Sequence, residues 1–205
     1  MTTTLQPVRL TEGQVEESAA VLARAFFDDP LMLYFIPEAA ERSEVLPWFM
    51  GCGAQLGLAF GEVYTTPGKV EGDAVWLPPG ETELQEDRLA QVGFMEAPQR
   101  MGEAAFGRFV GAMAHLDELH KAAVPPEHWY LLILGVDPPR QGQGVGGALI
   151  QPVLARADAA KLPCYLETMK PRNVPFYRKH GFEVVVEDDL PGGACHYWTM
   201  RRDPR

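Results

Sequence analysis

The feature that constrains this chain most is a strand, a turn and a glycine-rich segment that follow one another over residues 131–150. An apolar strand comes first, Asp137-Pro-Pro139 makes the turn, and four glycines between positions 142 and 147 open an apolar helix. The start of a helix leaves backbone N–H groups without partners, and glycine lets an anion approach them closely. The segment therefore predicts a site for a phosphate or pyrophosphate group.

Two well-known phosphate-binding loops compare poorly with this segment. A P-loop NTPase needs a lysine and a hydroxyl after its last glycine, but the residues after Gly147 are apolar, which excludes this class. The dinucleotide pattern Gly-x-Gly-x-x-Gly is met by Gly142, Gly144 and Gly147. Against it, two prolines separate the strand from the loop and prevent sheet pairing. Only 58 residues follow the last glycine, too few to complete a doubly wound domain.

A third pattern fits the segment better. The pattern Gln-x-x-Gly-x-Gly follows the Val-Asp-Pro turn and is met by Gln141, Gly144 and Gly146. Further on, residues 173–182 read Asn-Val-Pro-Phe-Tyr-Arg-Lys-His-Gly-Phe. With one helix and one strand between them, the two segments resemble the acetyl-CoA-binding half of the GNAT superfamily of N-acetyltransferases. The puromycin N-acetyltransferase branch is also similar over residues 128–136, 165–168 and 172–177.

The resemblance implies an α+β fold with a mixed, mostly antiparallel central sheet, in which two parallel central strands splay apart and helices flank the sheet. It implies one domain over residues 1–205, with an acceptor-side half at 1–126 and an acetyl-CoA-binding half at 127–205. Acetyl-CoA is the implied cosubstrate. The residues implied to bind it are Leu134, Gly135, Val136, Gln141, Gly142, Gln143, Gly144, Val145, Gly146, Gly147, Ala148 and Asn173.

Hydrophobic periodicity predicts the elements around these motifs. A capping box of Thr11 and Gln14 begins an amphipathic helix that Asp28-Asp29-Pro30 ends. The run Trp129–Val136 predicts a central strand buried on both faces, with Gly135 as the place for a bulge. Other helices are expected at 39–60, over 81–123 with a break near 97–98, at 144–160 and at 173–180. Other strands are expected at 7–10, 61–66, 73–77, 163–168, 182–187 and 194–200.

Acetyl transfer to an amine needs a base for the amine and an acid for the departing thiolate. The resemblance assigns the acid to Tyr177, because a phenol with a pKa of about 10 is suited to protonate a thiolate. Glu167 is the candidate base or ammonium anchor, since a carboxylate on a central strand is disfavoured unless it pairs with a cation or has a functional role. A structural ion pair with Arg172 is its alternative role. His128 lies at the far end of its strand from the glycine loop, so a structural role is expected for it.

The acceptor pocket is expected around the loop that follows the first helix. Aromatic side chains with a carboxylate suit a cationic, partly apolar amine. The expected reaction is direct attack of a primary amine of a small molecule on acetyl-CoA in a ternary complex. Two alternatives stay open, namely acetylation of a protein or peptide amine by the same fold, and a non-catalytic CoA-binding regulatory protein. The candidate acceptor residues are Phe27, Asp28, Asp29, Tyr34 and Trp76.

Composition narrows the partners and the compartment. The formal net charge of −10 argues against nucleic acid or an anionic membrane as a partner. Cys52, Cys164 and Cys195 are spaced for neither a disulfide framework nor a zinc site, so cytoplasmic thiols and no metal are expected. No signal peptide is visible, and no apolar run is long enough to span a bilayer. A cytoplasmic monomer or homodimer is expected.

Overall fold

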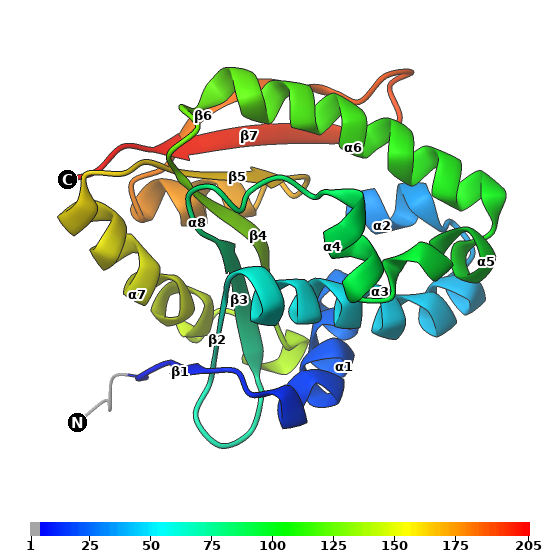
Figure 1. Ribbon diagram of the computed structural model, residues 1–205, viewed down its shortest axis with the longest axis horizontal. Coiled ribbons are helices and arrows are strands. Elements are labelled where there is room, and N and C mark those ends of the chain that lie inside the picture. Colours follow the sequence, from blue (N-terminus) through cyan, green and yellow to red (C-terminus); the bar gives the residue numbers. More distant parts are fainter. Residues whose placement is uncertain (1–4) are drawn as a thin grey trace.

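A seven-stranded sheet forms the centre of the computed structural model, which describes residues 5–205 (Figure 1). The strand order is β1-β2-β3-β4-β5-β7-β6, and β4 and β5 are the parallel neighbours in it. The strands are β1 Val8–Arg9, β2 Glu62–Thr65, β3 Gly72–Leu77, β4 Trp129–Val136, β5 Cys164–Thr168, β6 Glu183–Asp189 and β7 His196–Arg202. The α-helices are α1 Val15–Phe26, α2 Pro30–Phe35, α3 Ala39–Phe60, α4 Glu86–Gln91, α5 Ala97–Met101, α6 Glu103–Ala123, α7 Val145–Ala160 and α8 Asn173–Lys179.

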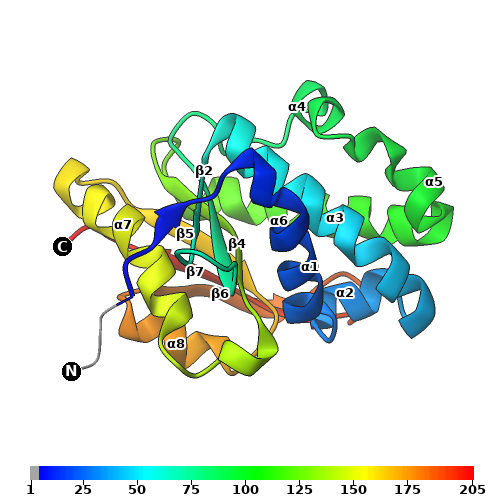
Figure 2. The same ribbon diagram turned by 90° about the horizontal axis from the view of Figure 1, so that it is seen from below.

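Helices cover both faces of this sheet (Figure 2). On one face, α7 and α8 bury a core that includes Trp76, Leu149 and Leu166. On the other face, α1, α2, α3 and α6 bury a second core, of which Leu22 and Phe35 are members. Each sheet face thus has its own apolar layer, as the alternation of side chains along a strand requires. The expected mixed, mostly antiparallel sheet with flanking helices is confirmed.

The two parallel strands part almost at once. Their Cα register pairs Trp129 with Cys164 and Tyr130 with Tyr165, and no later pair joins them over the rest of their described lengths. The predicted parting between the central strands is therefore confirmed. Beyond Tyr130, β4 keeps its partner on the β3 side and faces the gap on the other. Backbone groups along that gap are available to a ligand.

The short helices at the start of the chain follow from local capping. Gln14 accepts a hydrogen bond at its side-chain oxygen from the Thr11 backbone N–H at 3.1 Å, as the capping box predicts. Asp29 is buried and accepts from the Leu31 N–H at 3.0 Å, while Pro30 occupies the first turn of α2. The Asp-Asp-Pro segment therefore ends α1 and also begins α2, a helix that the sequence did not predict.

Several boundaries differ from the expectations for physical reasons. Ala97-Pro98 begins α5 instead of breaking a helix, because proline is tolerated in a first turn. The break before α6 comes at Gly102, whose φ of 78° favours glycine. Strand β4 is only half-buried from Leu132 to Leu134, because the gap opens beside it. The last strand inserts between β5 and β6, an order that local sequence does not encode.

The bulge in β4 is also displaced from its expected position. The register against β3 shifts between the pairs Val75–Ile133 and Trp76–Leu131, so the extra residue is Leu132 and not Gly135. Gly135 has a different reason to be glycine. A Cβ atom there would lie 2.5 Å from the Leu22 side chain, so glycine allows α1 to pack closely on the strand.

Candidate active site

The glycine-rich segment forms the start of α7 with the geometry of an anion site. Gly142 and Gly144 have φ values of 76° and 84°, which favour glycine, and Gly144 is the N-cap of α7. The Ala148 N–H donates to the Gly144 carbonyl at 3.1 Å and begins the internal hydrogen bonds of the helix. The N–H groups of the residues between them precede that ladder and are free for a phosphate.

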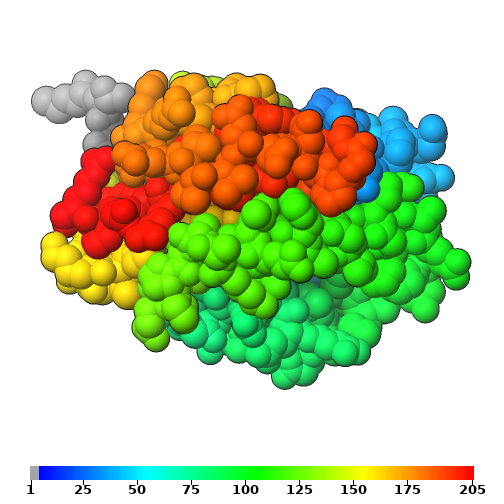
Figure 3. Space-filling model, turned by 90° about the horizontal axis from the view of Figure 1, so that it is seen from above, coloured from blue at the N-terminus to red at the C-terminus, as the bar shows by residue number. Residues whose placement is uncertain are grey.

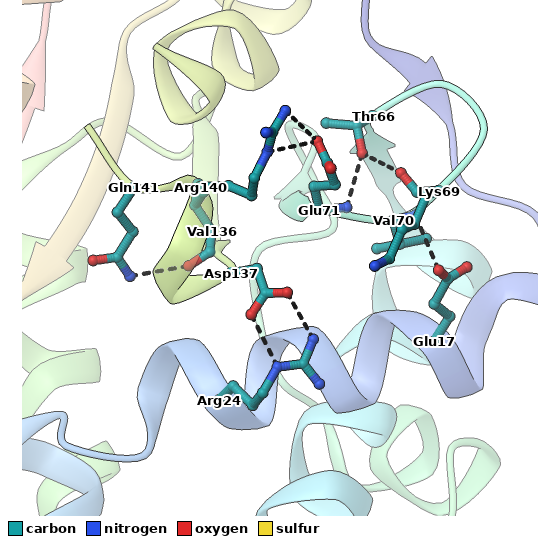
Figure 4. Close-up of polar contacts among 10 residues, drawn as sticks. All are labelled: Glu17, Arg24, Thr66, Lys69, Val70, Glu71, Val136, Asp137, Arg140 and Gln141. Carbon is teal, nitrogen blue, oxygen red and sulfur yellow. Dashed lines mark hydrogen bonds and ion pairs between the residues drawn. The ribbon is translucent and has the colours of Figure 1, made fainter. Parts of the chain in front are cut away.

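A set of polar contacts holds this loop in place (Figure 4). Arg24 in α1 donates two hydrogen bonds to the Asp137 carboxylate at 2.9 and 2.8 Å, and this contact lowers the pKa of Asp137. The Asp137 N–H donates to the Glu71 carbonyl at 2.9 Å, and the Glu71 carboxylate accepts from Arg140 at 3.0 Å. Gln141 donates to the Val136 carbonyl at 3.0 Å. The loop is therefore fixed by α1 and the β2–β3 hairpin.

We expect the Arg24–Asp137 pair to tune cosubstrate affinity through this loop. Arg24→Gln removes both hydrogen bonds, and the change should raise the KM for acetyl-CoA roughly three- to tenfold with little change in kcat. Asp137→Asn breaks the same pair while keeping the cation, so an equal effect would exclude direct contact by Arg24. Arg100→Gln, which breaks the exposed Arg100–Glu96 pair in α5, is the control. Wild-type KM in both loop variants would contradict the expectation.

A cavity of about 460 Å³ opens at the carboxyl ends of β4 and β5. Its wall combines the end of α1, the turn after β4 and the segment between β5 and α8, which meet where the central strands part. Basic groups outnumber acidic ones in this wall, which suits a ligand that carries phosphate. The lining residues are Arg24, Ala25, Asp28, Pro30, Pro138, Gln141, Lys170, Pro171 and Arg172.

Tyr177 lies in α8 on the α7 side of the sheet. Its side chain is buried against Phe176 and Phe182, with ring centroids 5.1 and 5.8 Å away. Burial, and then the negative charge of Asp29, raise the pKa of Tyr177 above its usual value. The phenol therefore stays protonated at neutral pH. Asn173, at the start of the same helix, donates its side-chain N–H to the Thr168 hydroxyl at 2.9 Å and so joins α8 to the end of β5.

Glu167 lies two residues beyond Tyr165, the last position at which β5 pairs with β4, and so lies beside the gap. Its side chain accepts a hydrogen bond at Oε2 from the Tyr130 hydroxyl at 2.9 Å. Burial raises the pKa of Glu167 to about 7, and the Tyr130 and Tyr165 hydroxyls offset part of that rise. No cation of the described chain lies within ion-pair distance of this carboxylate, so the alternative pairing with Arg172 does not occur in residues 5–205. A carboxylate that titrates near neutrality suits a general base.

The candidate acceptor residues fall into two groups. Asp28 is exposed and lines the cavity, whereas Phe27 and Tyr34 are half-buried and pack against the core on the α1–α2 side without lining the cavity. Trp76 is different, because it is wholly buried and packs edge-on against Trp129 in the core beneath α7, with ring centroids 6.5 Å apart. A substrate cannot reach that ring without unpacking the core, so its assignment to the acceptor pocket is wrong.

Asp29 and Lys170 form a pair that crosses the two halves of the site. The Lys170 ammonium lies 3.4 Å from Asp29 Oδ2, and both side chains are largely buried. Asp29 was a sequence candidate, but Lys170 was not, because a lone lysine between a strand and a helix gives no local signal. Tyr130 was missed for a similar reason, since it reads as one more apolar position of its strand.

Among residues 5–205, no group of three histidine, cysteine or acidic side chains is arranged to hold a metal ion. The same part of the chain contains no helix that is long and apolar enough to cross a membrane.

Comparison with known proteins bears on the enzyme class of the chain. The family model for the acetyltransferase (GNAT) domain matches residues 100–184. An uncharacterized N-acetyltransferase of Schizosaccharomyces pombe is 28% identical over 184 residues, which cover 85% of this chain and 72% of the relative.

Solved structures share the fold over nearly the whole chain. The histone acetyltransferase HPA2 and related acetyltransferase of Corynebacterium glutamicum has a TM-score of 0.68 at 21% identity, with 99% of this chain and 98% of that chain covered. Arylalkylamine N-acetyltransferase 2 of Aedes aegypti has a TM-score of 0.65 at 13% identity, with coverages of 99% and 100%. These structural matches establish the GNAT fold, and the family model and the yeast relative add the enzyme class. The chain therefore has the GNAT fold, and the domain match and the yeast relative support an N-acetyltransferase enzyme.

Proposed function

We propose that this protein transfers the acetyl group of acetyl-CoA to a primary amine of a small molecule, by direct attack in a ternary complex. The observation that carries the proposal is the placement of two groups on opposite faces of the parted strands. Glu167 and Tyr165 share the β5 face that α6 covers, whereas Tyr177 belongs to the core beneath α7 and α8. In this proposal Glu167 acts as the base from one side of the sheet and Tyr177 as the acid from the other.

The residues of the loop and of the gap hold the cosubstrate in this proposal. Acetyl-CoA supplies an acetyl group activated as a thioester. The N–H groups at the start of α7 bind its pyrophosphate, and the basic cavity wall adds Lys170 and Arg172 near the phosphates. Backbone groups of Leu134, Gly135 and Val136 face the pantetheine arm along the gap, and Asn173 lies beside it.

Three proton transfers complete the reaction. The Glu167 carboxylate accepts a proton from the acceptor ammonium, which frees the nitrogen lone pair to form a bond with the acetyl carbon. The bond between that carbon and sulfur breaks, and the Tyr177 hydroxyl donates its proton to the sulfur. The nitrogen, which carries a surplus proton after it bonds to the acetyl carbon, gives that proton to the Tyr177 phenolate, so that the neutral amide forms and the hydroxyl is restored. The raised pKa of Tyr177 keeps its hydroxyl protonated at neutral pH, and a pKa of about 7 lets Glu167 accept a proton increasingly well as the pH rises above neutrality.

The acceptor is proposed to be cationic and partly apolar. Support comes from the Asp28 carboxylate at the cavity and from the aromatic side chains of Phe27 and Tyr34. Two of the similar solved structures are named for amine acceptors of this kind. They are the polyamine N-acetyltransferase of Drosophila melanogaster and the arylalkylamine N-acetyltransferase 2 of Aedes aegypti. Puromycin belongs among the test acceptors because of the motifs at 128–136 and 172–177. Three buried free thiols suit a reducing cytoplasm.

The test is release of free CoA thiol with a panel of puromycin, aminoglycosides, polyamines, arylalkylamines and peptides. We expect turnover with at least one small amine and little with peptides. Turnover with peptides alone would replace the proposed acceptor with a protein amine. Tight binding of acetyl-CoA without turnover on any acceptor would favour the regulatory alternative, and absence of binding would overturn the assignment of the glycine loop.

A further inference from the structure

A buried pair of histidines lies behind the proposed base and has no part in the reaction described above. His120 is in α6 and His128 directly precedes β4, and their side chains are 8% and 4% exposed. The two Nε2 atoms are 2.7 Å apart. Figure 3 shows the green surface of the α6 region beside the orange and red surface of the chain's last segments.

The hydrogen bonds fix the protonation of both rings. A carbonyl oxygen only accepts, so the 2.6 Å contact to the Pro125 carbonyl requires a proton on His128 Nδ1. In a neutral imidazole the other nitrogen then accepts, so His120 Nε2 must donate to His128 Nε2. Burial lowers the pKa of His120 to about 4 and also lowers the pKa of His128. Both rings are therefore neutral and oriented at neutral pH.

The oriented His120 ring packs on the two tyrosines nearest to Glu167. It stacks on Tyr165 with ring centroids 4.2 Å apart and an interplanar angle of 11°, and its centroid lies 4.5 Å from that of Tyr130. Tyr130 in turn donates its hydroxyl to the Glu167 carboxylate. The buried Tyr165 hydroxyl has no hydrogen-bond partner within the described residues. The histidine pair thus sets the position of the rings that border the carboxylate.

The charged groups around this arrangement come from several elements. On α6, the Asp117 carboxylate lies 2.8 Å from the Lys121 ammonium, which also lies 3.7 Å from the Glu83 carboxylate in the segment between β3 and α4. The Asp117 charge adds to the rise in the pKa of Glu167. From β7, Thr199 and Tyr197 act on Tyr165. No cation among these groups pairs with Glu167, and its ionised form is favoured first by the Tyr130 hydrogen bond and then by the nearby Tyr165 hydroxyl.

We propose that His120 and His128 are positioning residues for Glu167, an inference that rests on the proposed role of Glu167 as base. Their hydrogen bond holds the His120 ring against Tyr130 and thereby keeps the Tyr130 hydroxyl on the carboxylate. When the bond between the histidines is lost, the ring is free to turn and the hydroxyl is held less well. The ionised form of Glu167 then becomes less favourable, and its titration moves to higher pH.

Two substitutions at one position test this inference. His128→Leu fills a similar volume but offers no acceptor to the His120 N–H, whereas His128→Gln keeps a side-chain carbonyl for it. The acid limb of kcat/KM should move upward by about half to one pH unit in His128→Leu and by clearly less in His128→Gln. His196→Ala, at an exposed histidine that bonds to Asp189, is the control and should keep the wild-type profile.

A direct readout separates this inference from the proposed function. The Glu167 carboxyl can be titrated by carbon-13 NMR of glutamate-labelled protein, with its signal assigned by loss in Glu167→Gln. The midpoint should rise in His128→Leu, and by a similar amount in Tyr130→Phe, and the double variant should show less than the sum of the two shifts. If His128→Leu does not fold, His120→Phe, which keeps a ring but loses the hydrogen bond, takes its place.

The outcomes distinguish the two ideas. A wild-type NMR midpoint in the folded histidine variant would overturn the positioning role and leave the pair as core packing. A shifted midpoint together with full turnover by Glu167→Gln would instead refute Glu167 as the base, while the positioning of its carboxyl by the histidines would stand.

Discussion

Replacing Tyr177 by phenylalanine is expected to lower kcat by at least about tenfold while leaving the affinity for acetyl-CoA unchanged. The substitution removes only the hydroxyl, because the ring contacts with Phe176 and Phe182 are retained. The departing thiolate would then have to take its proton from water. Steady-state kinetics give kcat, and calorimetric titration of the variant with acetyl-CoA gives the affinity.

The control for this variant is Tyr64→Phe, a tyrosine of β2 that packs under the Arg9 guanidinium. It should keep wild-type turnover. Because the pKa of Tyr177 is raised, wild-type activity should show no basic limb from this residue near neutrality. Unchanged turnover in Tyr177→Phe would show that Tyr177 does not take part in the chemistry and serves only in core packing beneath α7 and α8.

Glu167→Gln is expected to lower kcat/KM roughly a hundredfold or more at pH 8 and to abolish the acid limb of the profile. The direction of this pH dependence follows from burial, which raises the pKa of Glu167 to about 7. The base must be ionised to work, so wild-type activity should fall as the pH drops through 7. A neutral amide has no such titration, and its residual rate should be flat across this range.

Stability provides the control for this second variant. A carboxyl whose pKa is raised on folding stabilises the protein fully below its unfolded pKa, and that contribution is lost as the pH rises through 7. At pH 8 the glutamine variant should therefore unfold at the same temperature as the wild type or a higher one. A variant that keeps its acid limb and most of its activity would show that another group takes the proton.

Much of the cofactor side was predictable from the sequence because its signals are local. Glycines with positive φ at 142 and 144 and a helix that starts after them are encoded within a few residues. The gap between the central strands followed from the family resemblance and is confirmed by the register of β4 and β5.

The rest depends on contacts between residues far apart in the chain. Packing sets the order of the last two strands and the burial of Trp76 under α7. The hydrophobic periodicity of the sequence does not predict either feature. Tyr130 from β4 and His120 from α6 come together beside Glu167. Neither residue type by itself indicates that it will lie next to a buried carboxylate. Asp29 was predictable as a helix stop, but its pairing with Lys170 was not.

The early separation of β4 and β5 leaves open strand edges in the middle of the sheet. Proteins normally shield such edges, since an open edge can pair with other chains. In the proposed function the shield is acetyl-CoA itself, and a ligand at a hundredfold excess over its Kd stabilises the folded state by about 2.7 kcal/mol. If the proposed function holds, the stability of the folded enzyme would be coupled to the metabolic supply of acetyl groups, so that starvation for the donor would deplete the catalyst as well as its substrate.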